Sequence, residues 1–206
     1  KNMARIALGQ SKMVSRPFAG FLHVIVYIGF VVINIEVLEI VIDGLFGTHR
    51  VFQPLLGNTI YGFLIGTFEI LAFLVLVAVI LFWLRRNIIQ LKRFMSKEMK
   101  GWPKSDGNLI LYFEIVLMSL FIVMNATDHT FQEANIGNPI SQFVGPWFSG
   151  YSLETLATIE HTAWWVHIIG ILIFLNYLYY SKHLHILLAF PNTFFANLDP
   201  NGQFNN

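Results

Sequence analysis

The chain has 206 residues, of which 55% are hydrophobic and only 12% are charged, with a formal net charge of +1 and a mean hydropathy of +0.60. A soluble domain carries about 25% charged residues, so this composition indicates a protein of the lipid bilayer. The sequence has no cysteine, which excludes disulfides, thiolate-held iron–sulfur clusters and cysteine zinc sites within the chain. No phosphate-binding glycine loop or dinucleotide fingerprint is present, and we expect no nucleic-acid binding.

Four apolar stretches are long enough to cross a bilayer, which takes about 20 helical residues. They cover residues 18–42, 60–84, 109–126 and 156–180. Pro17 suits the first turn of the first helix, and Glu114 interrupts the third stretch early. The sequence therefore predicts an all-α transmembrane helical bundle with four spans. We expect a transmembrane domain over residues 1–190 and a cytoplasmic tail or linker over residues 191–206.

The basic residues predict the orientation of the bundle. Twelve of the 13 lie before the first span, between the second and third, or after the fourth, and only Arg50 lies on the other side. The positive-inside rule then places both termini and the middle loop in the cytoplasm. The basic loop 85–107 is expected to contact anionic lipid headgroups. The chain starts at Lys1 without an initiator methionine, so we expect a piece of a longer polypeptide.

Histidines in and near the spans point to a metal cofactor. His167 and His185 are 18 residues apart, which is five turns of one continuous helix and a rise of roughly 27 Å. That rise is close to the ~30 Å of the hydrocarbon core. A haem b with two histidine ligands takes one histidine from each of two facing helices. His23, near the cytoplasmic start of the first span, matches the depth of His185, so these two are predicted to ligate a haem b.

The partner of His167 is less well defined by the sequence. The first span has no second histidine, and the remaining candidates on the outer side are His49, His129 and His161. We favour His49, because its loop can fold back over the first span to complete a second, outer haem. By helical phase, His183 points away from His167 and is expected to face lipid headgroups or a partner. A histidine within the membrane can also be a hydrogen-bonded packing residue, so one haem or two remain open.

Acidic residues within the spans form a second group. Glu36, Glu39 and Asp43 share one face of the first span, Glu69 lies in the second, and Glu114 lies in the third. An ionised carboxylate at the bilayer centre costs about 2.5–3.5 kcal/mol on insertion scales, so such groups usually mark a proton path, an ion site or a quinone pocket. Hydrogen bonding between protonated acids and polar neighbours on adjacent helices is the other interpretation.

Two segments carry a resemblance to a known family. They are Phe18-x-Gly20-x-x-His23 and Trp164-Trp165-x-His167 followed by Asn176-Tyr177-x-Tyr179-Tyr180-Ser181-Lys182-His183-Leu184-His185. The chain resembles membrane cytochrome b domains related to the nitrate reductase gamma subunit, in the form fused to heterodisulfide-reductase-type (Fe-S)-binding proteins. The resemblance implies a bundle with a fifth, N-terminal helix, haem b, electron exchange with quinone, and His23, His167 and His185 as ligands. It also implies that the spans lie in the inner membrane of a bacterium. In the nitrate reductase subunit the first of these helices supplies a second ligand, whose equivalent here is near Ile33.

These observations predict a membrane haem b module that exchanges electrons between quinone and a cytoplasmic iron–sulfur protein or domain, within a larger complex. Glu36 and Glu39 would exchange the protons of the quinone. The alternative is a haem-free ion- or proton-conducting subunit that uses the carboxylates of the spans. A third interpretation is a structural anchor or assembly subunit.

Overall fold

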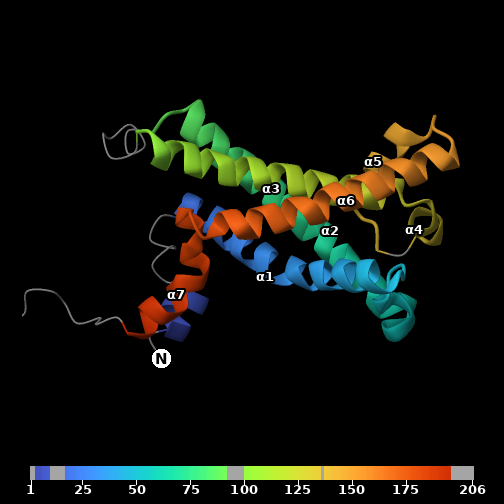
Figure 1. Ribbon diagram of the computed structural model, residues 1–206, viewed down its shortest axis with the longest axis horizontal. Helices are drawn as coiled ribbons and strands as arrows, with labels where there is room; N and C mark the ends of the chain where they lie inside the picture. The colour runs from blue at the N-terminus through green and yellow to red at the C-terminus, as the bar shows by residue number, and fades with distance from the viewer. Residues whose placement is uncertain (1–2, 10–16, 92–99, 136, 196–206) are drawn as a thin grey trace, which may run out of the picture.

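Four long helices form a bundle in the computed structural model, which describes residues 3–9, 17–91, 100–135 and 137–195. They are α1 (Pro17–Phe46), α2 (Phe52–Asn87), α3 (Trp102–Thr127) and α6 (Leu153–Leu178), labelled in Figure 1. Each is long and apolar enough to cross a membrane, which confirms the predicted all-α transmembrane bundle. Residues 92–99 of the predicted basic loop and residues 196–206 of the predicted tail lie outside the described residues.

Shorter helices gather at the two ends of the bundle. At one end α4 (His129–Ala134), α5 (Ser141–Val144) and the 3-10 helix η4 (Gly145–Phe148) connect α3 to α6. At the other end α7 (His185–Phe194) lies beside the π-helix η1 (Ala4–Leu8). We call the first the acidic end, because it carries Asp43, Asp128 and Glu160, and the second the basic end, because it carries Arg85, Arg86 and Lys182.

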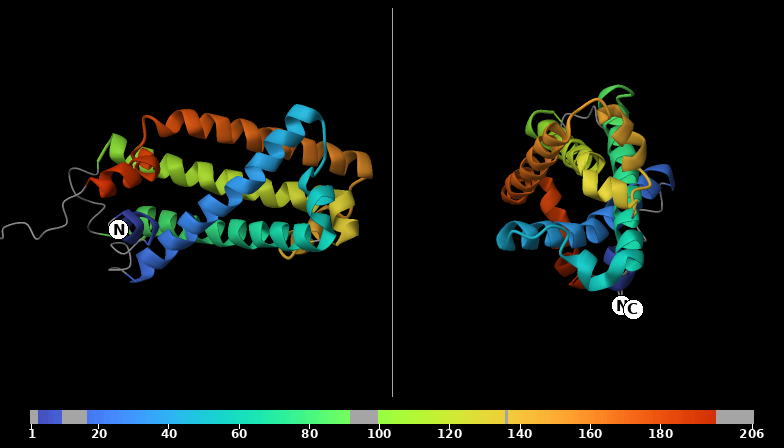
Figure 2. Two further views of the ribbon diagram at one scale, coloured as in Figure 1. Left: turned by 90° about the horizontal axis from the view of Figure 1, so that it is seen from below. Right: turned by 90° about the vertical axis from the view of Figure 1, so that its right-hand side faces the viewer.

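The helices α2 and α3 occupy the middle of the bundle, with α1 packed on α2 and α6 packed on α3. Figure 2 shows α1 crossing the other helices obliquely. The crossing is close at Gly29, where an added β-carbon would overlap the side chain of Val75. Gly170 plays the same part for α6, because an added β-carbon there would lie 2.8 Å from Leu117 Cδ2. Small residues at both contacts let the backbones approach closely, as is common between membrane helices.

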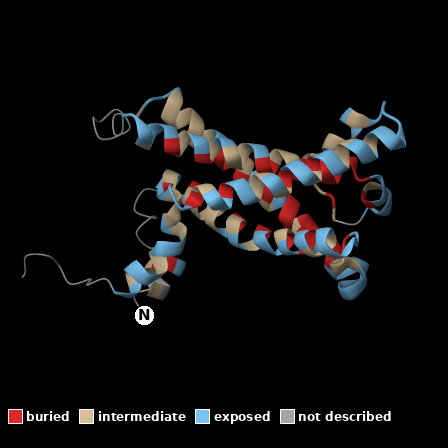
Figure 3. Ribbon diagram, in the orientation of Figure 1, coloured by how far each residue is buried: buried red, intermediate tan, exposed pale blue. Residues whose placement is uncertain are grey.

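Burial follows the pattern expected in lipid. Ile65, Phe68 and Phe121 are completely buried between the helices, and Figure 3 shows the buried positions facing the interior of the bundle. The outer surfaces carry large apolar side chains such as Phe63, which is 79% exposed. A soluble protein rarely leaves a contiguous apolar surface of this kind. Lipid is therefore the environment that suits the outside of these helices.

One prediction about the segment after the fourth span is wrong. His167 and His185 were expected to lie on one stripe of a continuous helix, but α6 ends at Leu178, close to the expected end near residue 180, and His185 begins a separate helix. Asp106 of α3 causes the break, because its carboxylate accepts hydrogen bonds from Tyr177 Oη and from the backbone N–H of Lys182, the latter at 3.1 Å. Ser181 Oγ then accepts the N–H of His183 and starts the short 3-10 helix η5 (Lys182–Leu184).

The contact at Gly29 predicts the effect of a small substitution. Gly29→Ala should lower the thermal unfolding midpoint of the detergent-solubilised protein, because overpacking costs about 1–3 kcal/mol. Val75→Ala in the same chain should restore much of the loss by removing the methyl groups that the new side chain meets. Val31→Leu, at an exposed position of the same helix, is the control. An unchanged midpoint in Gly29→Ala would show that the two helices are not in contact there.

Candidate functional site

A cavity of ≈ 540 Å³ opens at the basic end, between α1, α2, α3, α7 and η1. Its walls are largely apolar, with side chains from three of the long helices: Val26, Phe30, Val79, Phe82, Ile110 and Leu111. Among the polar residues that line it are His23, His183 and His185. A largely apolar pocket with a few convergent polar groups is the usual form of a small-molecule or cofactor site.

His23 and His185 face each other in this cavity, with ring centroids 6.5 Å apart. The sequence predicted this pairing from matched depth, although the two residues are far apart in the chain. Nδ1 of His185 hydrogen-bonds to the backbone carbonyl of Lys182 at 3.0 Å, which leaves Nε2 available as a ligand. Nδ1 of His23 is buried and has no hydrogen-bond partner among the described residues. A buried imidazole nitrogen without a hydrogen-bond partner costs free energy, unless a molecule or ion bound in the cavity interacts with it.

The spacing of the two rings fits two ligands on one metal. Imidazole nitrogens bind first-row metals at about 2 Å, so two rings on opposite sides of one iron have centroids roughly 6 Å apart. The 6.5 Å separation agrees with that arrangement. The apolar walls suit the faces of a planar macrocycle, and Arg86 lines the same cavity with a positive charge. The residues present therefore fit a haem.

His183 does not lie where helical phase placed it. It was expected to face lipid headgroups or a partner, but it lines the cavity and its ring contacts that of His185 at 5.5 Å between centroids. The phase argument fails because the chain leaves the helix after Leu178. Burial, followed by the nearby charge of His185, lowers the pKa of His183 to about 4. His183 is therefore an uncharged wall of the cavity.

Glu114 is a cavity residue that the sequence placed among the acidic residues of the spans but did not assign to the haem site. It lines the same space as His23 and Tyr27. The sequence signal was present, because Glu114 is the acidic residue that interrupts an otherwise apolar third span. Its position could not be assigned to a site without knowing that this face of α3 points toward α1.

His167 is buried in the middle of α6 at 2% exposure. Its Nδ1 hydrogen-bonds to the backbone carbonyl of Leu117 at 3.0 Å, and its ring lies 6.3 Å from that of Phe121. The ring contacts of the described residues pair His23 with His185 and do not pair His49 with His167. An outer haem on His167 therefore stays a prediction, and the observed contacts give this histidine a packing role between α6 and α3.

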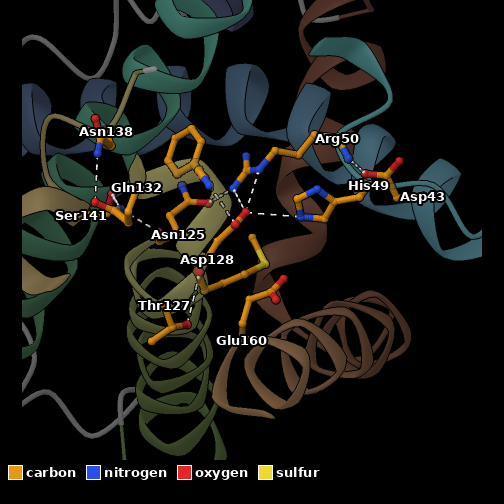
Figure 4. A network of polar contacts seen from close by, with 12 residues as sticks. Asp43, His49, Arg50, Asn125, Thr127, Asp128, Gln132, Asn138, Ser141 and Glu160 are labelled. Atoms are coloured by element: carbon orange, nitrogen blue, oxygen red, sulfur yellow. Dashed lines mark hydrogen bonds and ion pairs between the residues drawn. The ribbon is translucent and has the colours of Figure 1, made fainter. Parts of the chain in front are cut away.

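A buried polar network at the acidic end is organised by Arg50, as Figure 4 shows. Arg50 is 8% exposed, and its guanidinium donates to Asp128, Tyr61 and Asn125 at 2.9–3.2 Å. It also lies over the ring of Phe131, at 4.0 Å from the centroid. The sequence identified Arg50 only as the one basic residue on the side of the membrane opposite the other twelve. Its partners come from α2, α3 and the start of α4, so it joins these segments.

The four predicted carboxylates have different surroundings. Asp43 accepts hydrogen bonds from the backbone N–H groups of Arg50 and Val51, so it shapes the turn between α1 and α2. Glu69 accepts from Asn125 Nδ2 and from the N–H groups of Ile140 and Ser141, which attaches the α4–α5 loop to α2.

Glu39 accepts from Tyr61 Oη and from the backbone N–H of Phe52. Glu36 differs from the other three. It is 3% exposed, and its Oε2 has no hydrogen-bond partner among the described residues. Of the four predicted carboxylates, Glu36 is thus the one with an oxygen that has no hydrogen-bond partner among the described residues.

His49, Asp128 and Glu160 meet at the surface of the acidic end. His49 Nε2 lies 3.3 Å from Asp128 Oδ2, and the donor atoms of all three residues lie within 4.8 Å of one another. Burial opposes ionisation of Asp128, but the hydrogen bond from His49 and the charge of Arg50 lower its pKa to about 2. The same hydrogen bond raises the pKa of His49 above its usual value.

Fold and cavity together define a multi-pass helical membrane protein with a cofactor-sized pocket at one end. No protein-family model and no solved structure matches the chain. The chain is 28% identical over 198 residues to the probable iron–sulfur-binding oxidoreductase FadF of Bacillus subtilis, covering 95% of this chain and 26% of that protein. It is 22% identical over 209 residues to the EtfAB:quinone oxidoreductase of Syntrophomonas wolfei, covering 96% of this chain and 28% of that protein.

The chain therefore spans about a quarter of the length of these curated relatives. Both relatives are oxidoreductases by name, which agrees with the predicted similarity to (Fe-S)-binding proteins. Neither name refers to cytochrome b or nitrate reductase, so that narrower relationship stays a prediction.

The network around Arg50 predicts a large loss of stability when its charge is removed. Arg50→Met should lower the stability of the folded protein by about 3–5 kcal/mol, because Asp128 is left buried without its counter-ion. The double variant Arg50→Met, Asp128→Asn should recover part of that loss, and thermal unfolding in detergent measures both. Glu133→Gln, which alters the exposed contact between His129 and Glu133, should change stability by less than about 1 kcal/mol. Equal losses in all variants would contradict the role of Arg50.

Proposed function

We propose that this chain is the membrane module of a quinone oxidoreductase and holds one haem b between His23 and His185. The observation that carries the proposal is the pair of facing imidazoles, 6.5 Å apart across an apolar cavity. The names of the two relatives support the redox part, because one is an iron–sulfur-binding oxidoreductase and the other an EtfAB:quinone oxidoreductase.

The residues of the cavity act by holding and insulating the cofactor. The carbonyl of Lys182 orients the ring of His185, and α1 presents His23 from the opposite wall. The apolar side chains of α2 and α3 would exclude water from a bound haem, and Arg86, which lines the cavity, would supply a positive charge beside it. Bound haem supplies one-electron chemistry, and the protein sets its potential through these ligands and their surroundings.

Quinone chemistry also needs protons, and Glu36 is the residue that we assign to carry them. Its carboxyl group is buried within the bundle and keeps one oxygen unengaged, whereas Asp43 and Glu69 hold backbone N–H groups. A buried acid in a membrane helix is a common element of proton relays. Glu39, one turn further along α1, accepts a hydrogen bond from Tyr61 Oη.

The iron–sulfur partner is expected at the basic end. This end holds the cavity and the basic residues, which the positive-inside rule assigns to the cytoplasm. The relatives are several times longer than this chain, and one of them is named for iron–sulfur binding. The iron–sulfur partner can therefore be another domain of the same polypeptide.

A haem-free proton-conducting subunit is the second candidate function. The observation that favours it is again Glu36, because a buried, unengaged carboxyl oxygen serves proton transfer with or without a redox cofactor. The two candidates differ in whether the cavity at the basic end holds haem.

A reduced-minus-oxidised visible spectrum of the purified protein tests the haem. The wild type should show a haem b α band, and His23→Ala and His185→Ala should each lose it, because each removes one of the two histidines that would hold the haem. His183→Ala, which alters the same cavity wall, should keep the band and is the matched control. A wild type without the band contradicts the proposal, and loss of the band in His183→Ala with retention in His185→Ala would reassign the ligand.

Glu36→Gln tests the proton role. The rate of haem reduction by a quinol should fall roughly 100-fold, the usual effect of losing one general acid–base group, with the equilibrium spectrum unchanged. Glu154→Gln, at the exposed start of α6, should have no effect. If the wild type has no haem and Glu36→Gln abolishes proton flux into liposomes, the second candidate function is correct. An unchanged quinol rate in a haem-containing Glu36→Gln protein would contradict the proton role.

A further inference from the structure

We propose that His49, Asp128 and Glu160 form a binding site for a divalent transition-metal ion such as Zn²⁺ at the acidic end of the bundle. This site is separate from the haem cavity, which lies at the opposite end. In this proposal His49 binds the metal ion and does not bind the second haem that the sequence favoured.

The three side chains come from three different segments and converge on one point. His49 lies in the turn between α1 and α2, Asp128 lies between α3 and α4, and Glu160 lies on α6. One donor atom from each lies within 4.8 Å of the other two. In a tetrahedral zinc site with bonds of about 2 Å, neighbouring ligand atoms are roughly 3.3 Å apart. The separation of His49 Nε2 and Asp128 Oδ2 is 3.3 Å, so two of the three ligands already have that spacing.

The donor set selects the class of metal. One imidazole nitrogen and two carboxylate oxygens suit zinc and its first-row neighbours, whereas calcium and magnesium prefer oxygen ligands alone. Three protein ligands leave a fourth position for water. The site has an entrance, because the side chain of His49 is 58% exposed, while those of Asp128 and Glu160 are 5% and 18% exposed.

Neighbouring groups hold the central ligand in place. Asp128 Oδ1 accepts the backbone N–H of Phe131 at 3.0 Å, and Oδ2 accepts from Arg50 Nε at 3.0 Å. Outer contacts of this kind orient metal-binding carboxylates. Arg50 Nη2 also lies 2.9 Å from Oδ2, whereas Phe131 uses only one of the two lone pairs of Oδ1, so Asp128 keeps a lone pair on Oδ1 with which to bind an ion.

The charge balance at this end favours a cation. Arg50 is the single Lys or Arg at the acidic end among the residues that the structure describes. It faces Asp128 directly, and Glu160 and Asp43 add further carboxylates around the same turn, as Figure 4 shows. A bound divalent ion would neutralise the excess negative charge and join the α1–α2 turn to α6.

A calorimetric titration with Zn²⁺ tests the site. The full chain in detergent micelles is first freed of bound metals with a chelator and is then titrated. The wild type should bind one Zn²⁺ here, and His49→Ala and Glu160→Gln should each raise its Kd at least about tenfold, because each removes one ligand. His129→Ala is the matched control: it also removes an exposed histidine beside a glutamate, since His129 lies 3.5 Å from Glu133. It should bind Zn²⁺ as the wild type does.

Two further results separate this site from the haem cavity. His185→Ala should keep the zinc affinity of this site, and His49→Ala should keep the haem spectrum of the wild type. Tetrahedral absorption bands with Co²⁺ in place of Zn²⁺ should appear in the wild type and be absent in His49→Ala. Wild-type affinity in both His49→Ala and Glu160→Gln, or an equal loss in His129→Ala, would overturn the proposal whether or not the protein contains haem.

Discussion

The buried ion pair of Arg50 and Asp128 is the interaction on which the acidic end depends. A guanidinium removed from water needs both a counter-charge and partners for its N–H groups, and here these come from α2, α3 and the start of α4. Tyr61 and Asn125 then extend the network to Glu39 and Glu69. One cation thus organises carboxylates that would otherwise repel one another within the membrane.

The two ends of the bundle differ in how far their buried polar groups are hydrogen-bonded within the chain. At the acidic end most buried donors and acceptors have partners within the chain, so that end is built chiefly for cohesion. At the basic end His23 Nδ1 and an Arg85 guanidinium nitrogen are buried without a hydrogen-bond partner among the residues that the structure describes, and Glu36 Oε2 is the corresponding atom further along α1. Because proteins seldom leave such groups unsatisfied, these atoms mark the places where a bound molecule or a proton is expected.

Much of the fold could be predicted from the sequence, since the length and hydropathy of the spans depend only on local composition. Matched depth was also enough to pair His23 with His185. The end of α6 was not predictable from periodicity, because it depends on Asp106, a residue of another helix that captures the backbone of Lys182. The same contact turned His183 into the cavity. Glu114 and Arg50 were visible in the sequence, but their roles depend on which helix each one faces, and that is a property of tertiary packing.

The break after Leu178 also has a consequence for how the pocket is enclosed. Because His185 belongs to a short helix of its own, the wall opposite His23 is built by a segment outside the four spanning helices. That segment, α7, packs against η1 at the basic end. The position of one of the two facing imidazoles therefore depends on contacts between two short helices and not only on the packing of the spans.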